Sequence, residues 1–211
     1  MATRKQLEAA LAAWGKVETF EEACDLMARC IDGKYVWAPP HYMPETDEDI
    51  AEMGQGFLEE DSLMEAGFLA SINHGGILTI DSQAGAVEEG ISHRNGKKYV
   101  IRQRAYVIGL MLRDRVRLND LLKVMDHVDF RFVEGGSVKD PPVITEQNDK
   151  PVTTGRTQTV NQMVDYLGRT NVLSKKLLYD LRRNCQTVMF YDPMFGSPGL
   201  AAHIAMALRK V

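Results

Sequence analysis

The chain has 211 residues, of which 45% are hydrophobic and 26% are charged, with a formal net charge of −4. This composition can form a sizeable core, favours one domain and excludes wholesale disorder. No apolar stretch approaches the ~20 residues of a membrane-spanning helix, and no signal-peptide pattern opens the chain. With three cysteines, an odd number that indicates reduced thiols, we expect a cytoplasmic protein.

Charge is divided unevenly along the chain. Residues 1–90 hold 5 Lys and Arg against 18 Asp and Glu, whereas residues 91–211 hold 20 against 11. The two parts could neutralise each other within one fold, or they could form a dipolar surface that docks on an acidic or phosphate-bearing partner. The net acidity argues against a dedicated binder of duplex nucleic acid, which needs many Lys and Arg contacts to phosphate.

The first third of the chain carries helix signals. Apolar residues at helical spacing predict helices over 4–15, 20–31 and 61–73. Thr19, followed three residues later by Glu22, is a capping-box pattern that opens the second of these helices. Three prolines in 34–49 exclude a long helix or a central strand there, so we expect an ordered loop anchored by Trp37 and Tyr42.

The rest of the chain alternates strand and helix signals. Asn95-Gly96 is a strong hairpin signal, so strands should flank it. Strands are predicted over 77–83, 99–112, 130–134, 143–147, 152–158 and 186–193. Helices are predicted over 116–128, 159–168, 174–184 and 199–210. Ser197 and Pro198 have the residue types of a cap and a first helical position before the last helix.

These elements predict an α/β fold, with α+β as the alternative. Strands that alternate with helices are typical of layered packing. We expect a single three-layer-like domain over residues 1–211, with a mixed central sheet flanked by helices. Its acidic, mainly helical part would be 1–74, and its basic, sheet-forming part 75–211.

Standard catalytic motifs are missing from the sequence. It has no phosphate-binding glycine loop, nucleophile elbow, zinc-protease helix or dinucleotide fingerprint. The histidines show no ligand spacing, so we expect no metal and no cofactor. Cys185 follows Arg182 and Arg183, whose charges could lower its pKa. One thiol without a placed histidine is weak evidence for a nucleophile.

Two places could hold a polar ligand. The first combines two predicted strands, and its candidate residues are Thr79, Asp81, Ser82, Gln83, Gln103 and Arg104. If the strands are neighbours, the guanidinium of Arg104 could clamp a carboxylate or a phosphate. The same residues could instead be structural, with Asp81 and Arg104 as a buried ion pair that fixes the register.

The second place is the segment 191–199, which runs from a strand end to a helix start and contains Asp192. Ligands favour such strand ends in α/β sheets, and a helix N-terminus suits an anion. Asp192 is itself negative and would compete for the helix N–H groups. The alternative is that this segment only caps the helix.

Several pieces of the chain resemble an uncharacterised family, a domain of unknown function found in actinobacteria and, in related form, in large DNA viruses. The patterns are GxxTxxSQ at residues 76–83, QRAxVxG at 103–109 and DPxxG at 192–196. Ala84 stands where that family usually has proline, and Leu110 where it commonly has an aromatic residue. The resemblance implies an intracellular or virus-encoded α/β domain and gives no reaction.

Two functional hypotheses follow. In the first, the protein is a non-catalytic binding or assembly protein, which could be a virus-encoded accessory or virion component. It would bind a protein partner or form a homo-oligomer through its charged faces. In the second, it is an enzyme or sensor for a small polar or phosphate-bearing metabolite. Asp81 would then be the acid/base group, Ser82 and Gln83 would orient the ligand, and Arg104 would clamp its anion.

Overall fold

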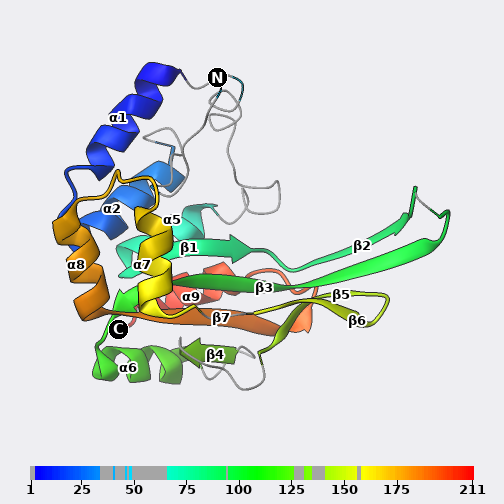
Figure 1. The fold of residues 1–211 in the computed structure, drawn as a ribbon. Helices are drawn as coiled ribbons and strands as arrows, with labels where there is room; N and C mark the ends of the chain where they lie inside the picture. Colours follow the sequence, from blue (N-terminus) through cyan, green and yellow to red (C-terminus); the bar gives the residue numbers. More distant parts are fainter. Residues whose placement is uncertain are drawn as a thin grey trace.

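The computed structural model describes residues 3–33, 40, 46, 48, 66–93, 95–125, 131–134, 141–155 and 158–211. The helices and strands in these residues are α1 Arg4–Trp14, α2 Phe20–Ile31, α5 Ala66–His74, β1 Ile77–Gln83, β2 Ala86–Ile91, β3 Lys98–Leu112, α6 Arg115–Met125, β4 Arg131–Glu134, β5 Val143–Gln147, β6 Lys150–Thr154, α7 Val160–Gly168, α8 Lys175–Asn184, β7 Cys185–Phe195 and α9 Leu200–Leu208. The predicted α/β class is confirmed (Figure 1). The predicted loop at 34–49, with Trp37 and Tyr42, lies almost wholly outside the described residues.

One long strand, β3, organises the sheet. It pairs with β1 and β2 along one edge and with β7 and β5 along the other, and β4 and β6 extend the sheet from β7 and β5. All six described pairings are antiparallel, so the expectation of a mixed sheet is wrong for these strands. Two of these pairings have a local cause, because hairpins link β2 to β3 and β5 to β6, and a hairpin connects only antiparallel strands.

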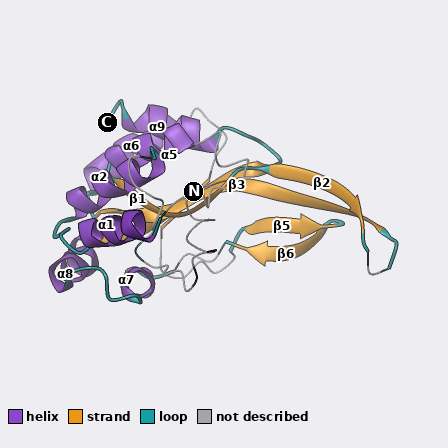
Figure 2. Cartoon of the chain, turned by 90° about the horizontal axis from the view of Figure 1, so that it is seen from above, coloured by secondary structure: helices purple, strands orange, loops and turns teal. Residues whose placement is uncertain are grey.

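Helices cover both faces of one end of the sheet. Helices α2, α5 and α9 pack on one face, with α6 against α9, while α7 and α8 pack against β7 on the other face (Figure 2). The resulting core includes Trp14, Phe20, Leu110 and Phe190, none more than 2% exposed. Among the described residues, no helix has the length and apolar character needed to cross a membrane.

Helix starts follow the sequence signals in most cases. Thr19 and Glu22 form the predicted capping box of α2, and Ser174 caps α8 through the N–H of Leu177. The predicted start at Ser197 and Pro198 is wrong, because α9 begins at Leu200 with Gly199 as its N-cap. Gly199 has a left-handed φ of 94° and offers no side chain to cap the helix.

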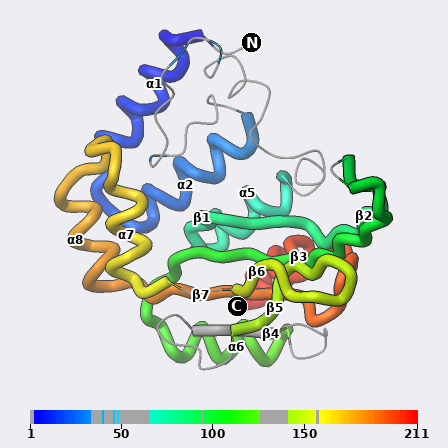
Figure 3. The backbone as a smooth tube through the Cα atoms, turned by 45° about the vertical axis from the view of Figure 1, so that its right-hand side comes forward, coloured from blue at the N-terminus to red at the C-terminus, as the bar shows by residue number. Residues whose placement is uncertain are grey.

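The sheet divides into two regions, of which only one is covered by helices. We call the helix-covered region the body; it contains β1, β4, β7 and residues 104–112 of β3. We call the remainder the arm; it contains β2, residues 98–103 of β3, β5 and β6. Figures 1 and 3 show the arm leaving the body on the side away from α1, α7 and α8. The predicted hairpins around Asn95-Gly96 and Asn148-Asp149 are confirmed and both lie in the arm.

Candidate functional site

The body and the arm meet where β3 changes partners. Up to Gln103, β3 pairs with β2 and β5; from Arg104 onwards it pairs with β7, and from Tyr106 with β1 as well. The N–H of Gly196 donates to the carbonyl oxygen of Gln103 at 2.8 Å and so holds the end of β7 against this point. We call residues 81–85, 103–106 and 191–197 the junction.

A close approach at Gly85 brings the two predicted ligand places together. A Cβ at Gly85 would lie 2.3 Å from the carbonyl oxygen of Ser197 and 2.9 Å from its nitrogen. Only glycine leaves room for that backbone contact. The segment after β1 and the segment after β7, predicted as separate candidates, are therefore neighbours in the structure.

The strand register nevertheless divides the first candidate set between two faces of the sheet. Ser82 lies opposite Val107, which is buried in the core, whereas Gln83 lies opposite Tyr106. Side chains of directly opposite residues share a face, and successive residues of a strand alternate. Asp81, Gln83 and Arg104 therefore belong to the face of Tyr106.

Ser82 and Gln103 belong to the opposite face. Of the predicted meeting between a serine–glutamine tip and a glutamine–arginine pair, only Gln83 and Arg104 share a face of the sheet. A β-bulge between Thr79 and Asp81 shifts the register at this point, and the sequence carries no clear signal for it.

Asp81 is paired with a tyrosine. The hydroxyl of Tyr106 donates to a carboxylate oxygen of Asp81 at 3.1 Å. Partial burial raises the pKa of Asp81, while hydrogen bonds from Tyr106 and from the backbone N–H of Ser82 act to lower it. The side chain still reaches solvent. The carboxyl group is therefore easier to protonate than an ordinary aspartate and could hold or release a proton.

Arg104 packs on aromatic rings. Its guanidinium carbon lies 4.3 Å from the ring centre of Phe195 and 6.0 Å from that of Tyr191, in cation–π geometry. Asp81 and Arg104, both described, form no ion pair within 4.0 Å, so the alternative of a structural Asp81–Arg104 pair is not found. A guanidinium held flat in this way keeps its outer N–H groups free of internal competition from Asp81.

Two buried polar atoms at the junction have no hydrogen-bond partner among the described residues. They are Nε of Arg104 and Nε2 of Gln103. A buried donor without a partner carries a desolvation penalty of about 1–3 kcal/mol, and a water or a ligand commonly satisfies such a group. Because the two residues alternate along β3, one such donor lies on each face of the junction.

Thr79 has a structural role. Its hydroxyl accepts from Nδ2 of Asn73 at 2.7 Å, and its N–H donates to Oδ1 of Asn73 at 3.0 Å. Asn73 is fully buried at the end of α5. This network ties α5 to β1, so Thr79 contributes to the packing of the body.

Asp192 closes a turn. Its Oδ1 accepts from the N–H of Met194 at 2.7 Å, at the irregularity where β7 resumes pairing with β3. The turn delivers Phe195 to its position opposite Arg104. Asp192 thus positions the aromatic partner of Arg104 and does not compete for the N-terminus of α9, which starts eight residues later.

Two further expectations from the sequence concern the reactivity of Cys185 and the binding of a metal ion. Burial raises the pKa of Cys185 to about 12, so the expectation that Arg182 and Arg183 lower it is wrong. The described residues include no group of three or more His, Cys, Asp or Glu that could hold a metal ion.

The sequence analysis missed the aromatic part of the junction. Tyr191 and Phe195 pack on Arg104 and Tyr106 binds Asp81, but none of the three was selected as a site residue, although Tyr191 and Phe195 lie in the candidate segment 191–199. A signal was present for Tyr106, which lies two residues after Arg104 and so shares its face of a strand. Tyr191 and Phe195 could not be placed without the register of β7.

Comparison with known proteins gives one family. The family described as Domain of unknown function (DUF6919) matches residues 9–211. No curated protein matches the chain.

Proposed function

The chain belongs to the family Domain of unknown function (DUF6919), and from that premise we propose that it is a non-catalytic binding or assembly protein that docks through its arm. The observation that carries this proposal is the exposure of the arm. Val87, Ile91 and Val152 are 54%, 61% and 58% exposed, although all three are apolar residues of strands β2 and β6 or of their ends. Val87 and Ile91 share one face of β2, and exposed apolar residues that share a surface are typical of interaction sites.

The arm also leaves two strand edges open. Among the described strands, β2 pairs only with β3, and β6 pairs only with β5. Every residue of β6 is exposed. An open edge presents unpaired N–H and C=O groups that can pair with a strand of another chain.

Charge indicates the kind of partner. No Asp or Glu occurs between Glu89 and Asp114 in the sequence, and this stretch carries Lys97 and Lys98 near the tip of the arm. A basic tip with exposed apolar neighbours fits an acidic protein surface, which includes a second copy of this net-acidic chain. An accessory or virion-associated role, as the family resemblance implies, is part of this proposal.

Two measurements with one set of variants test the arm. Sedimentation velocity reports self-association, and fluorescence anisotropy with labelled polyglutamate reports binding to an acidic chain. We expect at least one signal for the wild type. Lys97→Glu/Lys98→Glu and Ile91→Ser should weaken it, while Lys175→Glu on α8 should not. Absence of both signals, or equal behaviour of all variants, would contradict the proposal.

A second candidate function is the binding of a small anionic metabolite at the junction. The specific observation in its favour is the buried Nε of the Arg104 guanidinium, which has no hydrogen-bond partner among the described residues and lies in a group that packs on Phe195. Gln83 shares that face, and Asp81 with its raised pKa is the group that could exchange a proton. In this function Arg104 binds the anion and Asp81 acts as acid or base.

A thermal-shift screen with nucleotides and sugar phosphates tests this second function. A ligand that raises the melting temperature of the wild type should lose its effect with Arg104→Gln. Arg102→Gln, two residues away on the same strand, is the matched control and should keep the effect. If Arg104→Gln responds like the wild type, Arg104 is not the anion contact.

A further inference from the structure

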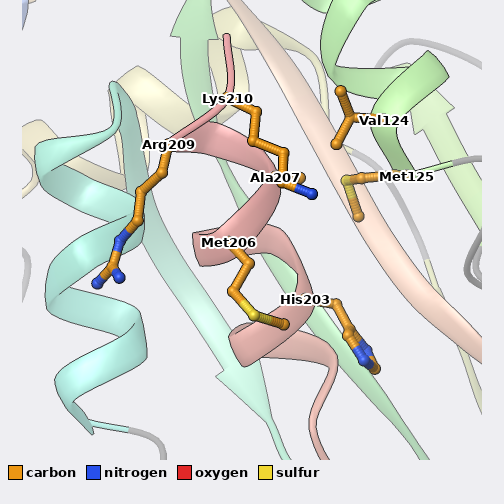
Figure 4. Close-up of a pocket in the computed structure, with 7 residues that line it drawn as sticks. All are labelled: Val124, Met125, His203, Met206, Ala207, Arg209 and Lys210. Atoms are coloured by element: carbon orange, nitrogen blue, oxygen red, sulfur yellow. The ribbon is translucent and has the colours of Figure 1, made fainter.

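A cavity lies between two helix ends, and none of its described lining residues belongs to the arm or the junction. Its volume is about 310 Å³, at the lower end of the range for ligand pockets, and it lies between the C-terminal turns of α6 and α9. Figure 4 shows the side chains that line it. Neither functional proposal uses this cavity, and the sequence analysis did not select any of its residues.

The wall of the cavity is mainly apolar and adaptable. Val124 and Met125 line it from α6, and Met206 and Ala207 line it from α9. Met206 is 49% exposed although it lies on a helix whose other apolar residues are largely buried. Methionine is flexible and fills irregular spaces, so this wall can adjust to a bound apolar group.

Basic side chains border the cavity. His203 and Lys210 line it, and in Figure 4 Lys210 extends from the end of α9 toward Val124 while His203 lies beyond Met206. Arg209 also belongs to the wall, but its side chain points away from Val124 and Met125. No acidic residue is among the described residues that line the cavity, and no ion pair joins Lys210 to a described acid.

The helix ends place partial negative charge beside these basic side chains. The C-terminus of a helix carries about half a negative charge, and both α6 and α9 end here. Lys210 carries a full positive charge and extends toward the apolar wall, so it offsets this partial negative charge. Among the described lining residues, Lys210 is therefore the group that favours an anion at the rim of the cavity.

We propose that this cavity binds a small amphiphile with an apolar chain and one anionic head group, such as a medium-chain carboxylate. The chain would lie on Met125, Met206 and Ala207, where it removes apolar surface from water. The head group would lie at the rim beside Lys210 and His203. Charge complementarity selects the anion over a neutral or cationic amphiphile of equal chain length.

The test uses decanoate below its micelle concentration, with decylamine as the cationic control. Isothermal titration calorimetry should show binding of decanoate and much weaker binding of decylamine. Lys210→Gln should weaken the binding of decanoate roughly two- to fivefold, the range that an exposed charge contact supports. Met206→Glu, an exposed substitution that places a carboxylate in the cavity, should abolish it. Lys175→Gln on α8 is the matched control and should bind like the wild type.

Methionine methyl NMR locates the binding. The methyl signals of Met125 and Met206 should shift on addition of decanoate, whereas that of Met27, buried in α2, should not. The proposal is overturned if decanoate does not bind, if decylamine binds equally well, if Met206→Glu binds like the wild type, or if the signals of Met125 and Met206 stay in place.

Discussion

Strand β3 runs through both the body and the arm, so the two regions can be compared within one strand. In the body, Val107, Leu110 and Met111 are at most 2% exposed, because helices cover both faces of the sheet there. In the arm, Val100 and Ile101 of the same strand are only half-buried. The backbone of β3 is paired in both regions, so the two regions do not differ in strand formation. They differ in whether helices cover the side chains, and the uncovered side chains of the arm are available to a partner.

The prediction with the largest expected effect tests this difference between the body and the arm directly. Leu110→Ala, at a fully buried position of β3, should lower the free energy of unfolding by about 2–5 kcal/mol, because it removes transfer free energy and leaves a cavity. Ile101→Ala in the arm should cost about 1 kcal/mol, since a half-buried side chain leaves no closed cavity. Urea denaturation followed by circular dichroism measures both. Equal losses would mean that the arm is as tightly packed as the body.

A smaller effect tests the contact between the two regions. Gly85→Ala places a methyl group against the carbonyl oxygen of Ser197, so strands or loop must shift, at a cost of about 1–3 kcal/mol. Gly67→Ala in α5 is the control, because no atom lies within 4 Å of its added Cβ and alanine favours a helix. If both variants unfold at the same urea concentration as the wild type, the junction is looser than the structure indicates.

Much of the fold could be predicted from the sequence, because local chemistry determines it. Thr19 with Glu22 specifies a helix start, and Asn95-Gly96 and Asn148-Asp149 specify turns at which Asn148 and Asp149 adopt positive φ. Strand direction was not predictable in the same way. A strand pattern does not name its partner, and the antiparallel pairing of β3 with β7 joins segments that are some eighty residues apart.

The junction was predictable only in outline. The sequence named Gln83, Arg104 and Asp192, and the structure brings their segments together. It could not assign faces, because the bulge after Thr79 moves Ser82 to the side opposite Arg104. The pairing of Asp81 with Tyr106 instead of Arg104 depends on that same shift.

A third prediction concerns the charges of the arm. Arg102 and Asp149 form an exposed ion pair of 2.9 Å that joins β3 to the turn between β5 and β6. Arg102→Gln should cost about 0.2–1 kcal/mol at low salt and less at 1 M salt, where exposed charges are screened. Urea denaturation at the two salt concentrations checks this. A loss that persists unchanged at 1 M salt would indicate packing of the Arg102 stem as the cause.

The smallest effect concerns Asp81, at the junction between the two regions. Its pKa is raised in the folded protein, so the native state holds the proton more tightly than the unfolded chain does. The stability that this preference contributes is present at low pH and is lost as the pH rises from about 4, the usual carboxyl range. Asp81→Asn cannot ionise and keeps an oxygen that can accept from Tyr106. It should therefore gain stability relative to the wild type between pH 4 and pH 7, by about 0.5 kcal/mol or less for so exposed a group.

Tyr106→Phe provides the sharper check on Asp81, because it changes the pKa through one contact. The hydroxyl of Tyr106 favours the ionised form of Asp81, so its removal should raise the pKa of Asp81 further. Carboxyl-detected NMR titration measures this pKa in both proteins. A pKa of Asp81 at or below the ordinary aspartate value in the wild type would show that hydrogen bonding outweighs burial at the junction. Asp81 would then be an ionised anchor for Tyr106, and the metabolite hypothesis would lose its proton donor.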